Sequence, residues 1–171
     1  MSENVKFTCS CCGKELEEWP ALTYRTPSPY FSLSEEEKEE LAEISTDFCK
    51  ITYPDQTDYF IRCTLTQKVN DSCQDLEYGV WASVSENNFN DYKENFHNPN
   101  HETTYFGWLC TEIPDYDMDN NIPTDINTQT GKNRPVVIPH DSCDHLFVQD
   151  YYNGISEEEA LKRIREMIGE K

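Results

Sequence analysis

The chain has 171 residues, and 33 Asp and Glu against 14 Lys and Arg give it a net charge of −19. Phosphates repel so acidic a protein, so the composition argues against binding to nucleic acid and to anionic membrane surfaces. The length favours one domain over residues 1–171, and a 12% aromatic content favours a folded core over disorder.

The start of the chain lacks the apolar stretch of a signal peptide, and 18 consecutive apolar residues occur nowhere. We therefore expect a cytoplasmic protein without a membrane segment. In that compartment its eight cysteines are expected to be free, metal-bound or reactive rather than disulfide-bonded. The acidic surface serves either solubility alone or the binding of a basic partner protein.

Residues 1–20 carry a cysteine knuckle. Cys9 and Cys12 enclose two residues and precede Gly13, and this C-x-x-C-G spacing lets a tight turn point both thiolates at one zinc ion. A tetrahedral zinc site needs two more ligands, and the chain has no second C-x-x-C pair. Free thiols and a redox pair are the alternatives. The other candidate ligands are Cys49, Cys63, Cys73, Cys110, Cys143, His97, His101, His140 and His145.

After the proline-rich residues 20–31, we expect a long acidic helix. Ser34 with Glu37 has capping-box spacing, as has Ser32 with Glu35, and the apolar stripe continues through Ile44 towards residue 48. Three glutamates in the first turn favour the positive end of the helix dipole.

Strands are predicted next, over residues 59–66 and 77–85, and turn residues between them favour an antiparallel hairpin. Residues 103–111 are predicted as a third strand and residues 135–139 as a short one, whose flanking prolines suggest either a sheet edge or strand ends. The aromatic residues of these strands and of the following segment are expected in the core; they are Trp81, Phe106, Trp108, Tyr151 and Tyr152.

Residues 86–102 and 114–133 are polar, with one weak helical turn around residues 89–96. A second helix begins after Ser156, with Glu159 completing its capping box. The order predicts a single α+β domain, with a central antiparallel sheet on which the long acidic helix and the C-terminal helix pack.

Two further patterns have the beginnings of a calcium site and of a nucleophile pair. Asp115, Asp117 and Asp119 have the opening spacing of a calcium loop, but Asn120 and Ile126 stand where glycine and glutamate are needed. A cysteine–histidine cluster over residues 140–145 could supply a nucleophile, although no glycines for an oxyanion hole lie nearby.

The order of several motifs resembles a bacterial family, domain of unknown function 2199. The similarity extends from Phe7 to about Ile168 and is carried by F-T-C-S-C-C-G-K, D-F-C-K-I, G-V-W-A-S-V-S, G-W-L-C-T-E-I-P and R-P-V-V-I. It implies a small cytoplasmic bacterial protein with no established activity. Cys9, Cys12 and Gly13 match the family's knuckle, and Cys49 and His145 fall in its other recurrent blocks.

We therefore predict a structural zinc ion held by Cys9, Cys12, Cys49 and His145. The favoured function is a non-catalytic binding or interaction module. One alternative is an immunity or inhibitor protein that neutralises a basic toxin or nucleic-acid-binding protein. The other is a hydrolase or redox enzyme that depends on cysteine or histidine.

Overall fold

The computed structural model describes residues 6–8, 15–114, 116, 122–129 and 133–167. The strands are β1 (Lys6–Thr8), β2 (Glu15–Glu17), β3 (Leu22–Thr23), β4 (Ala42–Ile44), β5 (Phe48–Thr52), β6 (Thr57–Gln67), β7 (Leu76–Val84), β8 (Thr104–Leu109), β9 (Ile122–Asn127) and β10 (Val136–Pro139). The helices are α1 (Ser28–Phe31), α2 (Glu35–Leu41), α3 (Glu86–Glu94), α4 (Leu146–Asn153) and α5 (Glu157–Met167).

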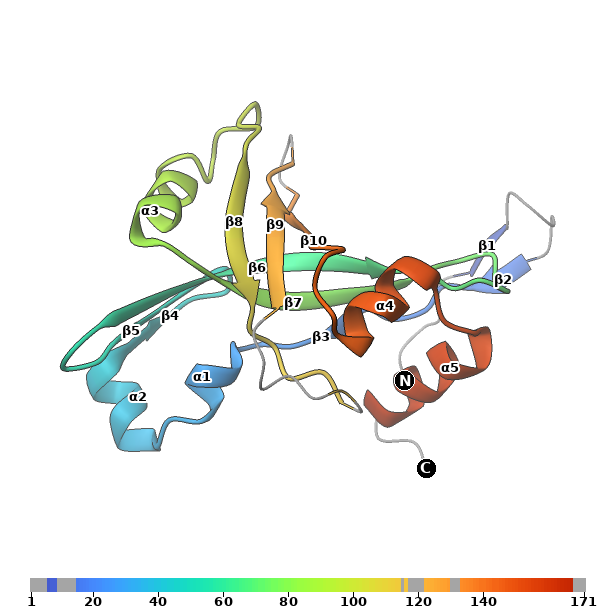
Figure 1. Ribbon diagram of the computed structural model, residues 1–171, viewed down its shortest axis with the longest axis horizontal. Helices are drawn as coiled ribbons and strands as arrows, with labels where there is room; N and C mark the ends of the chain where they lie inside the picture. Colours follow the sequence, from blue (N-terminus) through green and yellow to red (C-terminus); the bar gives the residue numbers. More distant parts are fainter. Residues whose placement is uncertain (1–5, 9–14, 115, 117–121, 130–132, 168–171) are drawn as a thin grey trace.

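A closed ring of five strands forms the centre of the molecule. The predicted hairpin is confirmed as β6 and β7, which pair antiparallel from Tyr59–Val84 to Gln67–Leu76. β8, β9 and β10 continue the sheet antiparallel, and β10 returns to β6. In Figure 1 the β6–β7 hairpin runs horizontally, and β8 and β9 cross it steeply.

The ring closes through one parallel bridge between Val136 and Thr64, and the Thr64 amide donates to the Pro135 carbonyl at 2.8 Å. The strand predicted over residues 135–139 is confirmed as β10, and its two prolines stand at the strand ends. The alternative, a sheet edge, is wrong, because β10 pairs with β9 on one side and with β6 on the other. Pro139 ends β10 with no N–H to satisfy. Its carbonyl accepts a hydrogen bond from the Tyr152 hydroxyl of α4.

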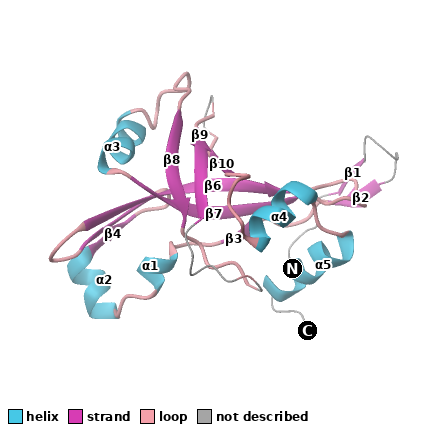
Figure 2. Ribbon diagram, in the orientation of Figure 1, coloured by secondary structure: helices cyan, strands magenta, loops and turns pink. Residues whose placement is uncertain are grey.

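Additional strands extend this ring at both sides, with β5 and β4 beside β6 and β3 beside β7 (Figure 2). The larger apolar cluster fills the ring beneath α3, α4 and α5 and includes Tyr78, Phe147 and Ile126. A smaller cluster around Trp81 and Phe60 lies under α1 and the β4–β5 extension. The expected α+β fold is thus confirmed, with a mostly antiparallel sheet.

The acidic helix is shorter than predicted. Ser34 caps α2 in a complete capping box with Glu37, as expected, but the helix ends at Leu41. Ala42–Ile44 instead pairs with β5, from Ala42 opposite Ile51 to Ile44 opposite Cys49. Pairing with an available sheet edge satisfies the backbone as well as a further helical turn does, so tertiary context overrides the helical pattern.

The C-terminal helix is confirmed as α5, where the Ser156 hydroxyl accepts from the Glu159 amide at 3.1 Å. Ala160 and Ile164 lie in the larger cluster. Arg163 is also buried, and its Nε donates to Glu159 at 3.0 Å and its Nη1 to the Tyr78 hydroxyl of β7 at 3.2 Å. None of the helices described here has the length and apolar character needed to cross a bilayer.

Candidate binding surface on β8, β9 and β10

The strand β8 carries aromatic residues on both faces. Side chains alternate between the two faces of a strand, and Tyr105, Gly107 and Leu109 point into the ring. Phe106 and Trp108 therefore point outward, with exposed fractions of 47% and 39%. The prediction that these two aromatic residues belong to the core is wrong, whereas that for Trp81 is confirmed, since this residue is fully buried.

The register across the three strands places outward side chains in rows. Phe106 stands opposite Asp125, which stands opposite Ile138. In the next row Trp108 stands opposite Pro123, and the amide of His140 donates to the Pro123 carbonyl at 2.9 Å. We call this surface the aromatic platform; it consists of Phe106, Trp108, Pro123, Asp125, Ile138 and His140.

Contacts within the aromatic platform hold its side chains in fixed positions. The rings of Phe106 and Trp108 pack edge to face, with centroids 5.3 Å apart and planes at 84°. The His140 ring lies 5.6 Å from that of Phe106, and its Nε2 is 2.8 Å from Asp125 Oδ1. The hydrogen bond between His140 and Asp125 orients the carboxylate beside the two rings.

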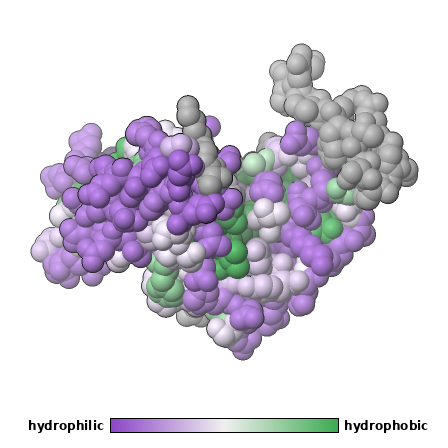
Figure 3. Space-filling model, turned by 90° about the horizontal axis from the view of Figure 1, so that it is seen from above, coloured by the Kyte–Doolittle hydropathy of each residue, from purple (hydrophilic) through white to green (hydrophobic). Residues whose placement is uncertain are grey.

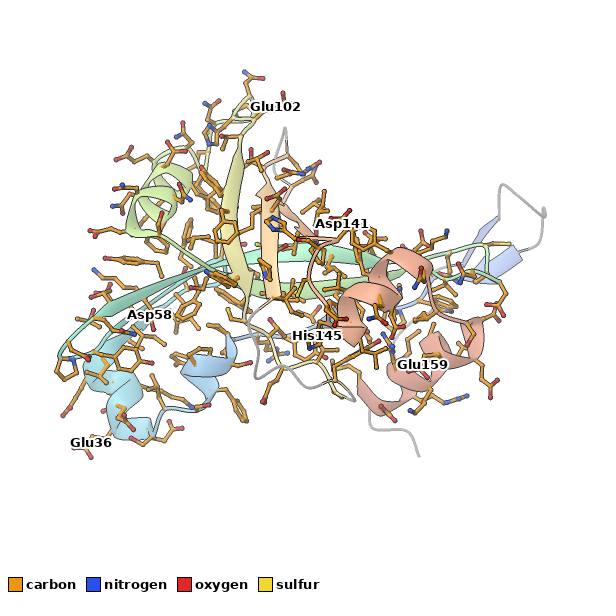
Figure 4. All side chains as sticks on the ribbon, viewed as in Figure 1. Glu36, Asp58, Glu102, Asp141, His145 and Glu159 are labelled. Atoms are coloured by element: carbon orange, nitrogen blue, oxygen red, sulfur yellow. The ribbon has the colours of Figure 1, made fainter. Side chains whose placement is uncertain are left out.

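Tyr152 of α4 borders the aromatic platform and is 44% exposed. Burial is the first cause of its raised pKa, and the neighbouring Tyr151, Asp141 and Asp125 raise the pKa further. Figure 4 shows Asp141 at the end of β10, close to α4. The carboxylates of Asp125 and Asp141 therefore give this edge of the aromatic platform a negative charge.

Cations are lacking in this part of the sequence. Residues 94–131 contain seven Asp and Glu and no Lys or Arg, and residues 135–161 contain six Asp and Glu and again none. Between these stretches stand Lys132, outside the described residues, and Arg134, whose Nε is 2.8 Å from Asp47 Oδ1. The strands β8, β9 and β10 and the helix α4 thus present aromatic and acidic side chains without a basic residue.

Figure 3 views the molecule from above and shows hydrophobic residues gathered in a hollow near the middle, with hydrophilic surface on both sides. An apolar centre within a polar rim is the usual arrangement of a surface that binds another protein.

The structure does not bring together the predicted zinc ligands that it describes. Cys9 and Cys12 lie outside the described residues. Cys49 is buried in the smaller apolar cluster, and burial raises its pKa to about 12. Nδ1 of His145 accepts from the Phe147 amide at 3.0 Å and so caps α4.

Figure 4 shows His145 beside α4, whereas Asp58, which pairs with Ile51 in the strand of Cys49, lies towards the opposite end. No three His, Cys, Asp or Glu of the described part of the chain are grouped so that they could hold a metal ion. The zinc site stays a prediction that rests on the spacing of the knuckle.

Cys63 and Cys110 are poor nucleophiles. Burial is the largest cause of the raised pKa of Cys63 and of Cys110, so both thiols are held protonated. The Cys143 amide donates to the carbonyl of His140 and the His145 amide to that of Cys143, which is the geometry of a turn. These contacts support no cysteine–histidine catalytic pair.

A polar network between α4, α5 and residue 116 was not foreseen from the sequence. Tyr116 donates to Asp150 at 2.5 Å and accepts from Arg163, whose guanidinium also lies over the Tyr116 ring. An open pocket of about 280 Å³ borders this network. Because Arg163 already bonds to Tyr78, Tyr116 and Glu159, the network fastens α5 to the barrel. The available sequence signal was the position of Arg163, which lies on the same helical face as Ala160 and Ile164.

The fold and this surface together define a small β-barrel domain with an exposed aromatic and acidic face. The chain belongs to a family of uncharacterised proteins conserved in bacteria, DUF2199, whose family model matches residues 8–155. The match ends before α5. No curated protein and no solved structure matches the chain.

Proposed function

We propose that this protein is a non-catalytic binding module and that its aromatic platform receives a basic segment of a partner protein. One observation carries the proposal: Phe106 and Trp108 are exposed beside the fixed carboxylate of Asp125, in a region without a described basic residue. Aromatic faces and carboxylates both attract cations, through the ring quadrupole and through ion pairing.

The charge of the whole molecule favours the same partner. A net charge of −19 speeds the approach of a basic protein and repels acidic competitors. Charge alone would attract cations everywhere, including to the acidic helix α2. The aromatic platform differs from α2 because it adds apolar area that stays exposed in the isolated chain, and burial of that area supplies affinity and position.

A titration with a defined basic peptide tests the proposal. We expect a 12-residue peptide of alternating Lys-Gly and Arg-Gly units to shift the backbone amide resonances of β8, β9 and β10 in NMR spectra. The double variant Phe106→Ala, Trp108→Ala should bind about tenfold more weakly, since each lost cation–π contact is worth about 0.5–1 kcal/mol.

The matched control is Phe31→Ala, because Phe31 is 77% exposed and lies on α1, outside the aromatic platform. This variant should bind the peptide as the unaltered protein does. Shifts confined to α2, or equal binding by the double variant, would show that the peptide senses only net charge and would overturn the proposal.

We also propose that a zinc ion bound by the knuckle supports the N-terminal segment structurally. Its support is the C-x-x-C-G spacing of Cys9, Cys12 and Gly13. Such an ion would stabilise the fold and would take no part in binding at the aromatic platform.

A further inference from the structure

We infer that the group recognised by the aromatic platform is the guanidinium of an arginine side chain rather than the ammonium of a lysine. This inference rests on the proposed function and specifies its ligand. Three features of the site carry it: the position of a carboxylate oxygen, the exposure of two flat rings next to it, and the absence of a described cation that would compete.

The first feature is the carboxylate of Asp125. Its Oδ1 is occupied by His140 Nε2 at 2.8 Å, which fixes the carboxylate, and its side chain is 49% exposed. Among the described residues, none donates to Oδ2. Asp125 therefore offers one oriented acceptor to a ligand, and a carboxylate held this way loses little side-chain entropy on binding.

The second feature is the pair of rings in the neighbouring strand. Phe106 is directly opposite Asp125 in the antiparallel ladder, and such pairs have Cβ atoms about 4.5–5.5 Å apart. Trp108 extends the apolar area along the same face, and both residues are partly exposed to solvent. A flat group that stacks on either ring can reach the carboxylate.

Arginine and lysine differ in what they need from such a site. The guanidinium is planar and weakly hydrated, so it stacks on an aromatic face while its edge N–H groups point sideways to a carboxylate. The ammonium of lysine is a compact, strongly hydrated charge that gains little from stacking. A ring and a carboxylate on adjacent strands therefore suit arginine.

The third feature is that no described lysine or arginine contacts the aromatic platform; His140 pairs with Asp125 through Oδ1 alone. The flanking Arg134 is paired with Asp47 through Nε, and Lys93 lies over the Phe89 ring of α3. Neither described cation contacts the aromatic platform. The site is thus available to a side chain from another molecule.

Two peptides of equal charge test the inference: one with four Arg-Gly-Gly units and one with four Lys-Gly-Gly units, measured by calorimetry at moderate salt. We expect the arginine peptide to bind about five- to tenfold more tightly. Trp108→Ala and Asp125→Asn should each remove most of this preference, and their melting temperatures will report whether they remain folded.

Glu102→Gln is the matched control for charge, because it makes the same change as Asp125→Asn at the far tip of the loop before β8 (Figure 4). It should leave the arginine preference intact. If the two peptides bind equally well and Trp108→Ala weakens both, the arginine inference is wrong and the proposed function stands. If neither peptide binds at the aromatic platform, the proposed function fails as well.

Discussion

Gly107 faces inward from β8 and lies close to Ser83 of β7 and Ile126 of β9. A Cβ atom at this position would lie 2.6 Å from the Ser83 carbonyl oxygen and 2.7 Å from Ile126 Cδ1. The backbone oxygen has little freedom to move away. Glycine is therefore needed here for space, and this close approach lets β8 turn its aromatic residues outward.

We predict that Gly107→Ala lowers the free energy of unfolding by about 1–3 kcal/mol, as overpacking of a core does. Urea unfolding at neutral pH measures this. Gly79→Ala is the matched control. The nearest atom to its Cβ would be Cγ2 of the Thr23 side chain, at 3.3 Å. Equal losses in both variants would mean that strand propensity, and not the contact at Ser83, sets the cost.

The alternation of residues in β8 does not by itself identify the aromatic platform. In T-Y-F-G-W-L both alternating sets contain large apolar side chains, so the pattern alone does not say which set faces the core. The small residue Gly107 in one set was the available signal, because it marks the face where another backbone approaches. Asp125 and His140 were unrecognised as a pair, since their contact depends on the register of β9 with β10.

At the scale of elements, α5 lies outside the residues matched by the family yet is tied to the barrel by a buried cation. Arg163 is 9% exposed and bonds to groups from β7 and from residue 116 as well as to its own helix. Its removal would leave Tyr78 and Glu159 without their partner.

We predict that Arg163→Met lowers the free energy of unfolding by about 2–4 kcal/mol, because breaking one side of a buried polar network leaves the other side uncompensated. Chemical denaturation measures the loss. Arg165→Met removes the same charge from an exposed position on the same helix and should cost under about 0.5 kcal/mol. Similar losses in the two variants would contradict a special role for Arg163.

The knuckle segment gives a prediction of its own. The double variant Cys9→Ser, Cys12→Ser should lose about one equivalent of zinc and melt at a lower temperature, because metal binding energy contributes to folding. Metal analysis of protein purified without chelator, together with thermal melting, measures both effects. Zinc-free protein and an unchanged melting point would refute the site; zinc retained by Cys49→Ser or His145→Asn would exclude that ligand alone.

The sequence predicted elements well where local signals agreed. The β6–β7 hairpin and α5 each have a periodic pattern bounded by turn or capping residues, and both are confirmed. β9 lies within the stretch predicted only as polar, because Pro123, Asp125 and Asn127 alternate with the inward Ile122 and Ile126. Helix α3 is longer than the single weak turn predicted there, and its pattern is weak because only Phe89 and Tyr92 of its residues are buried.

At the scale of the whole molecule, the core contains many protonated hydroxyl and thiol groups. Burial is the first cause that raises the pKa of Tyr24, Tyr92, Tyr105 and Tyr116 above the ordinary 10.0. The thiols of Cys63 and Cys110 are raised above 9.0 in the same way. The folded chain therefore holds these protons more tightly than the unfolded chain.

The free energy of unfolding should then be at its full value below about pH 9 and fall as the pH rises further. The unfolded state releases these protons first, and ionisation pulls the equilibrium towards it. Urea unfolding between about pH 8 and about pH 11 measures the decline. Tyr105→Phe, which removes one titrating group, should make the decline shallower. A constant free energy over this range would contradict the prediction.

The single bridge between Val136 and Thr64 also determines when the ring can be completed. The two residues are far apart along the chain, so their pairing has a high contact order and a large loop-closure entropy. During synthesis the β6–β7 hairpin can form early, but the barrel stays an open sheet with unpaired edges until residue 136 has left the ribosome. Partly synthesised chains that end before β10 are therefore the species most exposed to aggregation by edge pairing.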